Sequence, residues 1–281
     1  MQWTVGKVKV TKIVEIDTTG GTRFILPQAS TEEARKLPWL VPRFANDQGR
    51  LRMTIHSLIV ETPTRRIIVD TGLGNDKQGR HVPVWNGLNT PFLQQLTSAG
   101  YPPESIDLVL CTHLHVDHVG WNTRIEGDRW VPTFVNARYL FGKTEYEHWA
   151  AHQDDAAHPP VSFLDSVQPI VDAGRAELIG PETRVCEELT LLPTPGHSPG
   201  HLSVLIESEG ESLLLMGDAA HHPVQMAHLD WSSTVDHDPA QAIRTRHALF
   251  ARFADTPTRV IGGHFDIGHL VRDGDAFRLI A

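Results

Sequence analysis

The residues with the clearest chemical potential lie in segment 113–118, which reads His-Leu-His-Val-Asp-His. Three imidazoles and a carboxylate in so short a segment would be costly crowding in a protein without a metal. Neutral imidazole nitrogens and carboxylate oxygens are, however, donors that zinc and similar divalent cations accept. His113 and His115 alternate along an extended turn and point the same way, whereas Asp117 and His118 turn toward a second position. The segment therefore predicts a metal site rather than a polar loop that happens to be rich in histidine.

Other candidate donors follow the ends of apolar segments of strand length. The segments that end near Val69, Leu110, Leu192, Met216 and Ile261 lead to Asp70, His113, His197, Asp218 and His264, respectively. Loops held by a rigid sheet are where enzymes place reactive groups. These five positions therefore predict one site, gathered along one edge of the sheets.

The elements that must position these residues are short strands and a few helices. We expect strands at residues 4–16, 53–60, 67–69, 106–111, 137–141, 189–192, 202–207, 213–216 and 259–261, and helices at 92–99, 143–151 and 239–253. A further short helix begins near Thr31, where Ser30 and Glu33 form a capping-box pattern. No linker divides the chain. We expect a single domain over residues 1–281, with residues 17–50 as a candidate lid or dimerisation segment.

The composition is that of an acidic globular protein. The chain has 25 Lys and Arg against 34 Asp and Glu, a net charge of −9, and it shows no basic stripe of the kind that nucleic-acid enzymes use. It also lacks the run of about 20 apolar residues that a membrane helix needs. Cys111 and Cys186 make no disulfide framework, and the N-terminal residues do not resemble a signal peptide. We therefore expect a cytoplasmic protein that binds neither nucleic acid nor membranes.

In the order and context of its motifs, the sequence resembles the metallo-β-lactamase superfamily. The family's H-x-H-x-D-H motif stands at residues 113–118, after Asp70-Thr71-Gly72 and before His197 in TPGHSPGH, Asp218 in LLLMGD and His264 in VIGGH. The resemblance implies an α/β fold, an αββα sandwich of two mixed sheets with helices outside. It also implies a metal-dependent enzyme.

The resemblance further implies a dinuclear metal centre. One divalent ion would be held by His113, His115 and His197, the other by Asp117, His118 and His264, and Asp218 would bridge the two. Zinc is the first expectation, although a His/Asp site also accepts manganese, cobalt or iron(II). Asp70 would accept a hydrogen bond from a ligand histidine, the alternative being a turn residue beside Gly72. His201 would support the loop that presents His197.

Two cations about 3.5–4 Å apart can share a water and lower its pKa. The mechanism implied is attack of a metal-bridging hydroxide on a lactone or ester carbonyl, with Asp117 and Asp218 as catalytic metal-holding carboxylates. Lactonases of this superfamily often carry a tyrosine three residues after the bridging aspartate, where this chain has His221. We expect His221 to protonate or orient the substrate; the alternative is that it only packs beside the site.

The segment LLLMGDAAHHPVQ, followed by DPAQA, resembles the quorum-quenching acyl-homoserine-lactone lactonases and the methyl-parathion-type organophosphate hydrolases. True β-lactamases have Cys or Ser in place of Asp218. We therefore expect a lactonase acting on a small-molecule lactone or ester, with an organophosphate triester or aryl ester hydrolase as the alternative. A mononuclear iron persulfide dioxygenase and a binding module without catalysis remain as other classes, and the number of metal ions per chain separates the dioxygenase from a hydrolase. A homodimer formed through residues 17–50 is also expected.

Overall fold

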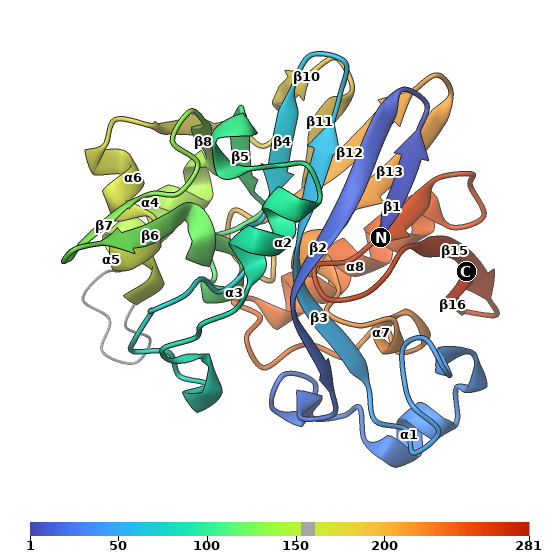
Figure 1. Cartoon of the computed structure of the whole chain (residues 1–281). Helices are drawn as coiled ribbons and strands as arrows, with labels where there is room; N and C mark the ends of the chain where they lie inside the picture. Colours follow the sequence, from blue (N-terminus) through green and yellow to red (C-terminus); the bar gives the residue numbers. More distant parts are fainter. Residues whose placement is uncertain (153–160, 281) are drawn as a thin grey trace. The chain divides into compact units, whose positions relative to one another are not determined.

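The computed structural model describes residues 1–152 and 161–280. They form two compact units, one of Met1–Glu15 with Ile55–Gly180 and the other of Ile16–Thr54 with Pro181–Ala281. We call them unit 1 and unit 2 (Figure 1). That residues 1–281 act as a single domain stays a prediction.

Unit 1 is built on a seven-stranded sheet in the order β1-β2-β3-β4-β5-β8-β9, of which residues 16–19 of β2 and 52–54 of β3 are counted in unit 2. Its strands are β1 (Gln2–Val5), β2 (Val8–Thr19), β3 (Arg52–Glu61), β4 (Arg66–Val69), β5 (Leu108–Cys111), β8 (Arg138–Gly142) and β9 (Ala176–Ile179). Strands β4, β5, β8 and β9 run parallel, whereas β1 with β2 and β3 with β4 are antiparallel. Because β4 and β5 are parallel neighbours, Asp70 and the 113–118 segment emerge at the same edge of this sheet.

Helices and a small hairpin accompany this sheet. They are α2 (Phe92–Ser98), α3 (Val116–Val119), α4 (Lys143–Ala151), α5 (Val161–Ser166), α6 (Gln168–Asp172), the hairpin β6 (Thr123–Glu126) and β7 (Arg129–Pro132), and the 3-10 turns η3 (Pro83–Trp85), η4 (Pro103–Ser105) and η5 (Gly120–Asn122). The core of unit 1 is apolar, with Ile68, Val109 and Phe141 from the sheet packed in one cluster with Phe92 of α2 and Phe163 of α5. This packing fixes the strand ends from which the donor-bearing loops begin.

Unit 2 holds a second seven-stranded sheet in the order β10-β11-β12-β13-β14-β15-β16. Its strands are β10 (Arg184–Cys186), β11 (Leu189–Pro193), β12 (Leu202–Ser208), β13 (Glu211–Leu215), β14 (Arg259–Ile261), β15 (Gly268–Asp273) and β16 (Ala276–Ile280). Only β13 and β14 pair in parallel, and two antiparallel steps from β11 through β12 bring β13 back to the direction of β11. The ends of β11, β13 and β14 therefore lie at one edge, which is where His197, Asp218 and His264 follow.

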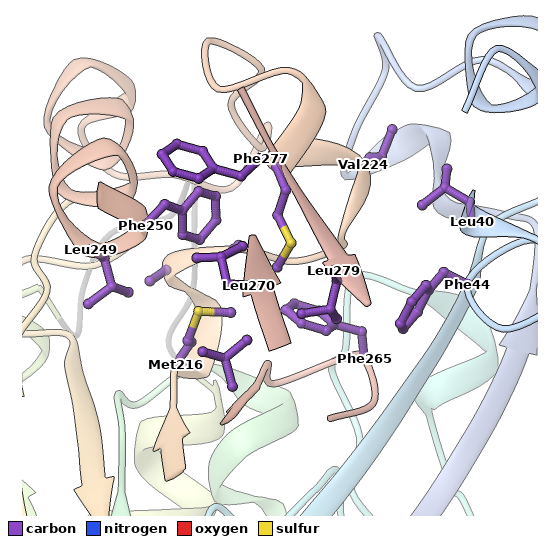
Figure 2. Packing of buried hydrophobic residues seen from close by; sticks show 14 of the residues in the cluster. Leu40, Phe44, Met216, Val224, Leu249, Phe250, Phe265, Leu270, Phe277 and Leu279 are labelled. Carbon is purple, nitrogen blue, oxygen red and sulfur yellow. The ribbon is translucent and has the colours of Figure 1, made fainter. Parts of the chain in front are cut away.

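The helical segments of unit 2 are α1 (Thr31–Arg35), α7 (Val224–Ala227), α8 (Pro239–Phe253), η1 (Thr22–Phe24), η2 (Pro38–Leu40) and η6 (Gly217–Ala219). Figure 2 shows the core of this unit, in which Leu40 and Phe44 belong to the same cluster as Val224 and Leu279. Leu40 is 0% exposed. The candidate lid segment therefore contributes apolar side chains to the core of unit 2. Its roles as a lid and in dimerisation stay predictions.

Most predicted elements are present, and one expectation needs correction. Helices α4 and α8 and strand β14 have the expected bounds, and Ser30 Oγ accepts the expected hydrogen bond from Glu33 N at 3.1 Å. The single strand expected at residues 4–16 is a hairpin, because Gly6 adopts a φ of 53° and turns the chain between β1 and β2. The C-terminal hairpin of β15 and β16 was not anticipated. Among the residues that the structure describes, no helix has both the length and the apolarity to cross a membrane.

Candidate metal centre

The loop after β5 gathers four of the predicted donors within unit 1. The ring centroids of His113 and His118 lie 4.0 Å apart, and those of His113 and His115 lie 4.6 Å apart. The Asp117 carboxylate on α3 lies with Oδ1 at 3.9 Å from His118 Nε2. His113 and His118 are buried, whereas His115 and Asp117 are half-buried. Imidazoles this close to one another and to a carboxylate match the donor chemistry of a divalent cation site.

Hydrogen bonds to Asp70 set the orientation of two of these histidines. Asp70 Oδ2 lies 2.8 Å from His118 Nδ1, as expected for an acceptor that orients a ligand histidine. The Thr112 hydroxyl donates to Asp70 at 2.8 Å, so its oxygen is left to accept from His113 Nδ1 at 3.0 Å. A histidine that donates from Nδ1 presents the lone pair of Nε2. Both rings therefore offer Nε2 to a metal.

The Asp-Thr-Gly turn packs closely against the 113–120 segment. Thr71 N donates to His118 O at 2.8 Å, and Gly120 N donates to Gly72 O at 2.7 Å. A side chain at Gly120 would place its Cβ 1.9 Å from the backbone of Leu73. Asp70 itself has a φ of 55°, a left-handed conformation that Asp tolerates better than most residues. The Asp-Thr-Gly turn thus places the Asp70 carboxylate beside His118.

Helix α4 supports the same loop through Glu145, which the sequence did not reveal. Glu145 Oε1 accepts from Leu114 N at 3.1 Å and from Trp149 Nε1 at 2.7 Å. The Trp149 ring packs edge-on against His115, with centroids 5.5 Å apart. Glu145 therefore fixes the backbone between His113 and His115.

Unit 2 places three imidazoles around one carboxylate oxygen. Asp218 Oδ2 lies 3.0 Å from His264 Nε2, 3.4 Å from His221 Nε2 and 3.6 Å from His197 Nε2. All four residues are buried, with exposed fractions of 1–4%. The short turn η6 carries Asp218, which follows Gly217 with its φ of 55°. Donors at such separations can converge on one cation.

Two of these histidines are also oriented through Nδ1. His197 Nδ1 lies 2.9 Å from Asp236 Oδ1, and His264 Nδ1 lies 3.1 Å from Thr54 O. Both acceptors favour the proton on Nδ1, so the lone pair of Nε2 is directed toward Asp218. The supporting role expected of His201 is also present, since its Nε2 accepts from Asp218 N at 2.9 Å and its Nδ1 meets Thr194 Oγ1 at 2.8 Å.

His221 differs from His197 and His264 in having no such acceptor. Among the described residues, neither ring nitrogen of His221 has a hydrogen-bond partner, although the residue is only 1% exposed. Its backbone N donates to Gln225 Oε1 at 2.8 Å, which fixes the residue. Burial lowers the pKa of His221 to about 3, against the opposing effect of Asp218. A neutral imidazole with open nitrogens is a competent hydrogen-bond donor or metal ligand.

The donor chemistry in both units thus fits divalent metal ions. His113, His115, Asp117 and His118 come together in unit 1, and His197, Asp218, His221 and His264 come together in unit 2. Sequence analysis did not identify Asp236, because it lies 39 positions from His197 and no motif links the two residues. The only available signal was that Asp236 lies shortly before the proline that begins α8.

Comparisons with known proteins agree with this chemistry. A family model described as the metallo-beta-lactamase superfamily matches residues 52–264, and the chain belongs to this superfamily. The predicted metallo-β-lactamase fold, of the α/β class, and the prediction of a metal-dependent hydrolase are confirmed.

The curated relatives share an activity. An N-acyl homoserine lactonase of Bacillus thuringiensis is 28% identical over 184 residues, which cover 61% of this chain and 66% of that protein. The N-acyl homoserine lactonase AttM of Agrobacterium fabrum is 30% identical over 189 residues, 58% of this chain and 64% of that protein. The matches thus span slightly less than two thirds of these relatives.

Solved structures extend the fold comparison to nearly the whole chain. The hydrolase AbOPH of the beta lactamase superfamily has a TM-score of 0.79 at 24% identity and covers 99% of this chain and 96% of its own. AidC, a dizinc quorum-quenching lactonase in complex with a product, has a TM-score of 0.78 at 21% identity, with 100% and 96% covered. At these identities the likeness establishes the fold.

Proposed function

We propose that the chain is a dinuclear metal hydrolase that opens the lactone ring of acyl-homoserine lactones. The observation that carries the proposal is the set of hydrogen bonds that Nδ1 donates in four buried histidines, which present Nε2 of His113, His118, His197 and His264. The lactonase activity of the curated relatives supports the choice of substrate.

The proposed metal ligands are those implied by the family motif. His113, His115 and His197 would hold one ion, Asp117, His118 and His264 the other, and Asp218 both. Two such cations supply Lewis acidity toward a carbonyl oxygen and lower the pKa of an attacking water. Zinc suits the donor set, and other divalent ions accept the same ligands.

The chain's own residues have distinct parts in the proposed reaction. Asp117 and Asp218 would hold the cations, and their carboxylates would accept hydrogen bonds from the attacking water and so orient its oxygen toward the carbonyl carbon. The ring C–O bond breaks as the new C–O bond forms, and the proton of the water passes to the departing ring oxygen. His221, a buried neutral imidazole with open nitrogens, donates a hydrogen bond to a substrate oxygen.

The proposal is tested by acid release from short- and long-chain acyl-homoserine lactones with zinc-loaded protein. A kcat/KM above roughly 10⁴ M⁻¹s⁻¹ that is lost in His113→Ala supports it. His221→Ala should lower kcat while the metal content stays unchanged, and unchanged kcat removes His221 from the mechanism. Absence of lactone turnover in a metal-loaded protein would move the assignment to organophosphate triesters and aryl esters.

A further inference from the structure

Behind His197, the core of unit 2 contains an ionic pair that the proposed reaction does not use. Asp236 and Arg246 have side chains 0% exposed, and Arg246 Nη2 lies 3.8 Å from Asp236 Oδ2. Burying two opposite charges is costly and yields little net stability, so a pair like this calls for a specific role. Both partners contact the segments that carry metal donors.

Asp236 holds the ring of His197. Its Oδ1 lies 2.9 Å from His197 Nδ1, while its Oδ2 accepts from Ser233 N at 2.9 Å. The backbone that follows is attached to the same loop, because His237 N donates to His197 O at 3.0 Å and Asp238 N donates to Gly196 O at 2.9 Å. The carboxylate therefore approaches His197 from a segment that is itself fixed to the His197 loop.

Arg246 reaches the other donor segment from α8. Its Nε donates to Ala219 O at 3.1 Å, the carbonyl directly after Asp218. Its Nη1 donates to Leu229 O at 3.0 Å and to Trp231 O at 2.9 Å. One guanidinium thus binds the turn that carries Asp218 and the loop leading to Asp236.

We propose that Asp236 and Arg246 are positioning residues that fix His197 and Asp218 relative to each other for metal binding. Asp236 sets the tautomer and the angle of the His197 ring, and Arg246 offsets the charge of Asp236 while it binds the Asp218 turn. The inference rests on the metal binding within the proposed function, but not on the identity of the substrate. Carboxylates that orient ligand histidines typically contribute 10–100-fold to metal affinity.

The test is zinc affinity of the full chain, measured by competition with a chromophoric chelator. Asp236→Asn leaves one side-chain oxygen, although His197 Nδ1 and Ser233 N both donate to this side chain. We therefore expect zinc affinity to fall 10–100-fold. Arg246→Lys keeps the charge, but its single nitrogen cannot replace both Nε and Nη1. It should therefore also weaken zinc binding. Asp165→Asn is the matched control, because Asp165 is a buried partner of Arg80, at 2.9 Å, in unit 1. It should lower the melting temperature while zinc affinity stays within about twofold.

Zinc affinity of Asp236→Asn within about twofold of the unsubstituted protein, or an equal loss in Asp165→Asn, would overturn the inference. If the variants fail to fold, the zinc-loaded unsubstituted protein decides by NMR. A His197 Nδ1 proton protected from exchange supports the hydrogen bond to Asp236, and a rapidly exchanging one refutes it. If Asp236→Asn loses zinc affinity and the zinc-loaded unsubstituted protein shows no lactone turnover, this inference stands and the substrate proposal is rejected.

Discussion

Replacing Asp70 by Asn separates orientation of a ligand histidine from packing. Asp70 accepts from Thr112 N, Thr112 Oγ1 and His118 Nδ1, each at 2.8 Å. An Asn side chain has nearly the same shape and also tolerates the φ of 55°. It has only one oxygen, however, so an amide N–H must face at least one of these donors. We expect His118 to lose its acceptor and to shift its proton to Nε2, the atom that should bind metal.

The magnitude follows from the lost contact. A hydrogen bond to a charged group contributes about 1.5–3 kcal/mol, so unfolding free energy should fall by about that amount. A 10–100-fold loss of metal affinity corresponds to about 1.4–2.7 kcal/mol. The assays are urea unfolding and chelator competition with zinc. Asp107→Asn is the control. Among the described contacts, the Asp107 carboxylate accepts only from Arg66 N, at 2.7 Å, and it contacts no donor histidine.

Zinc affinity of Asp70→Asn within about twofold of the unsubstituted protein would refute the reasoning, because it would show that His118 needs no acceptor at Nδ1. An equal loss in Asp107→Asn would also refute it, since the effect would then follow from general destabilisation.

Three further predictions concern stability. Gly120→Ala should destabilise the protein by at least about 2 kcal/mol in urea unfolding and reduce zinc content, because its Cβ would meet the Leu73 backbone at 1.9 Å; a neutral effect would contradict the close docking. Leu40→Ala should cost about 2–5 kcal/mol in the same assay, because Leu40 is 0% exposed in the core of unit 2; a cost below 1 kcal/mol would show that the segment is not part of that core. Burial lowers the pKa of His222 from 6.5 to about 4. As pH falls, this residue therefore takes up a proton in the unfolded chain before it does so in the folded protein. The free energy of unfolding should fall by up to about 3 kcal/mol between pH 6.5 and about pH 4. His222→Gln should reduce this acid sensitivity, and an unchanged pH profile of unfolding would contradict it.

Much of the site could be predicted because its residues combine short-range spacing with strand context. The donors at 113–118 are adjacent in sequence, and His197, Asp218 and His264 each follow a strand whose apolar pattern is visible. Strand ends at one sheet edge then bring donors together within each unit. Helix α8 could be predicted from its length and from the proline at its first turn.

The supporting residues could not be predicted because their partners are distant in sequence. Asp236 meets His197 across 39 positions and Glu145 meets Leu114 across 31, and no local pattern encodes such pairs. The hairpin in the first strand was missed for a different reason. Residues 2–16 alternate as one strand would, and only the positive φ of Gly6 divides them.

The most direct test of the account is the number of zinc ions retained per chain after loading and desalting, measured by elemental analysis. The two proposed ligand sets, which share Asp218, predict two ions per chain in the unsubstituted protein, with fewer in Asp218→Ala. One ion or none per chain, unchanged by that substitution, would contradict the dinuclear centre from which the proposed hydrolysis follows.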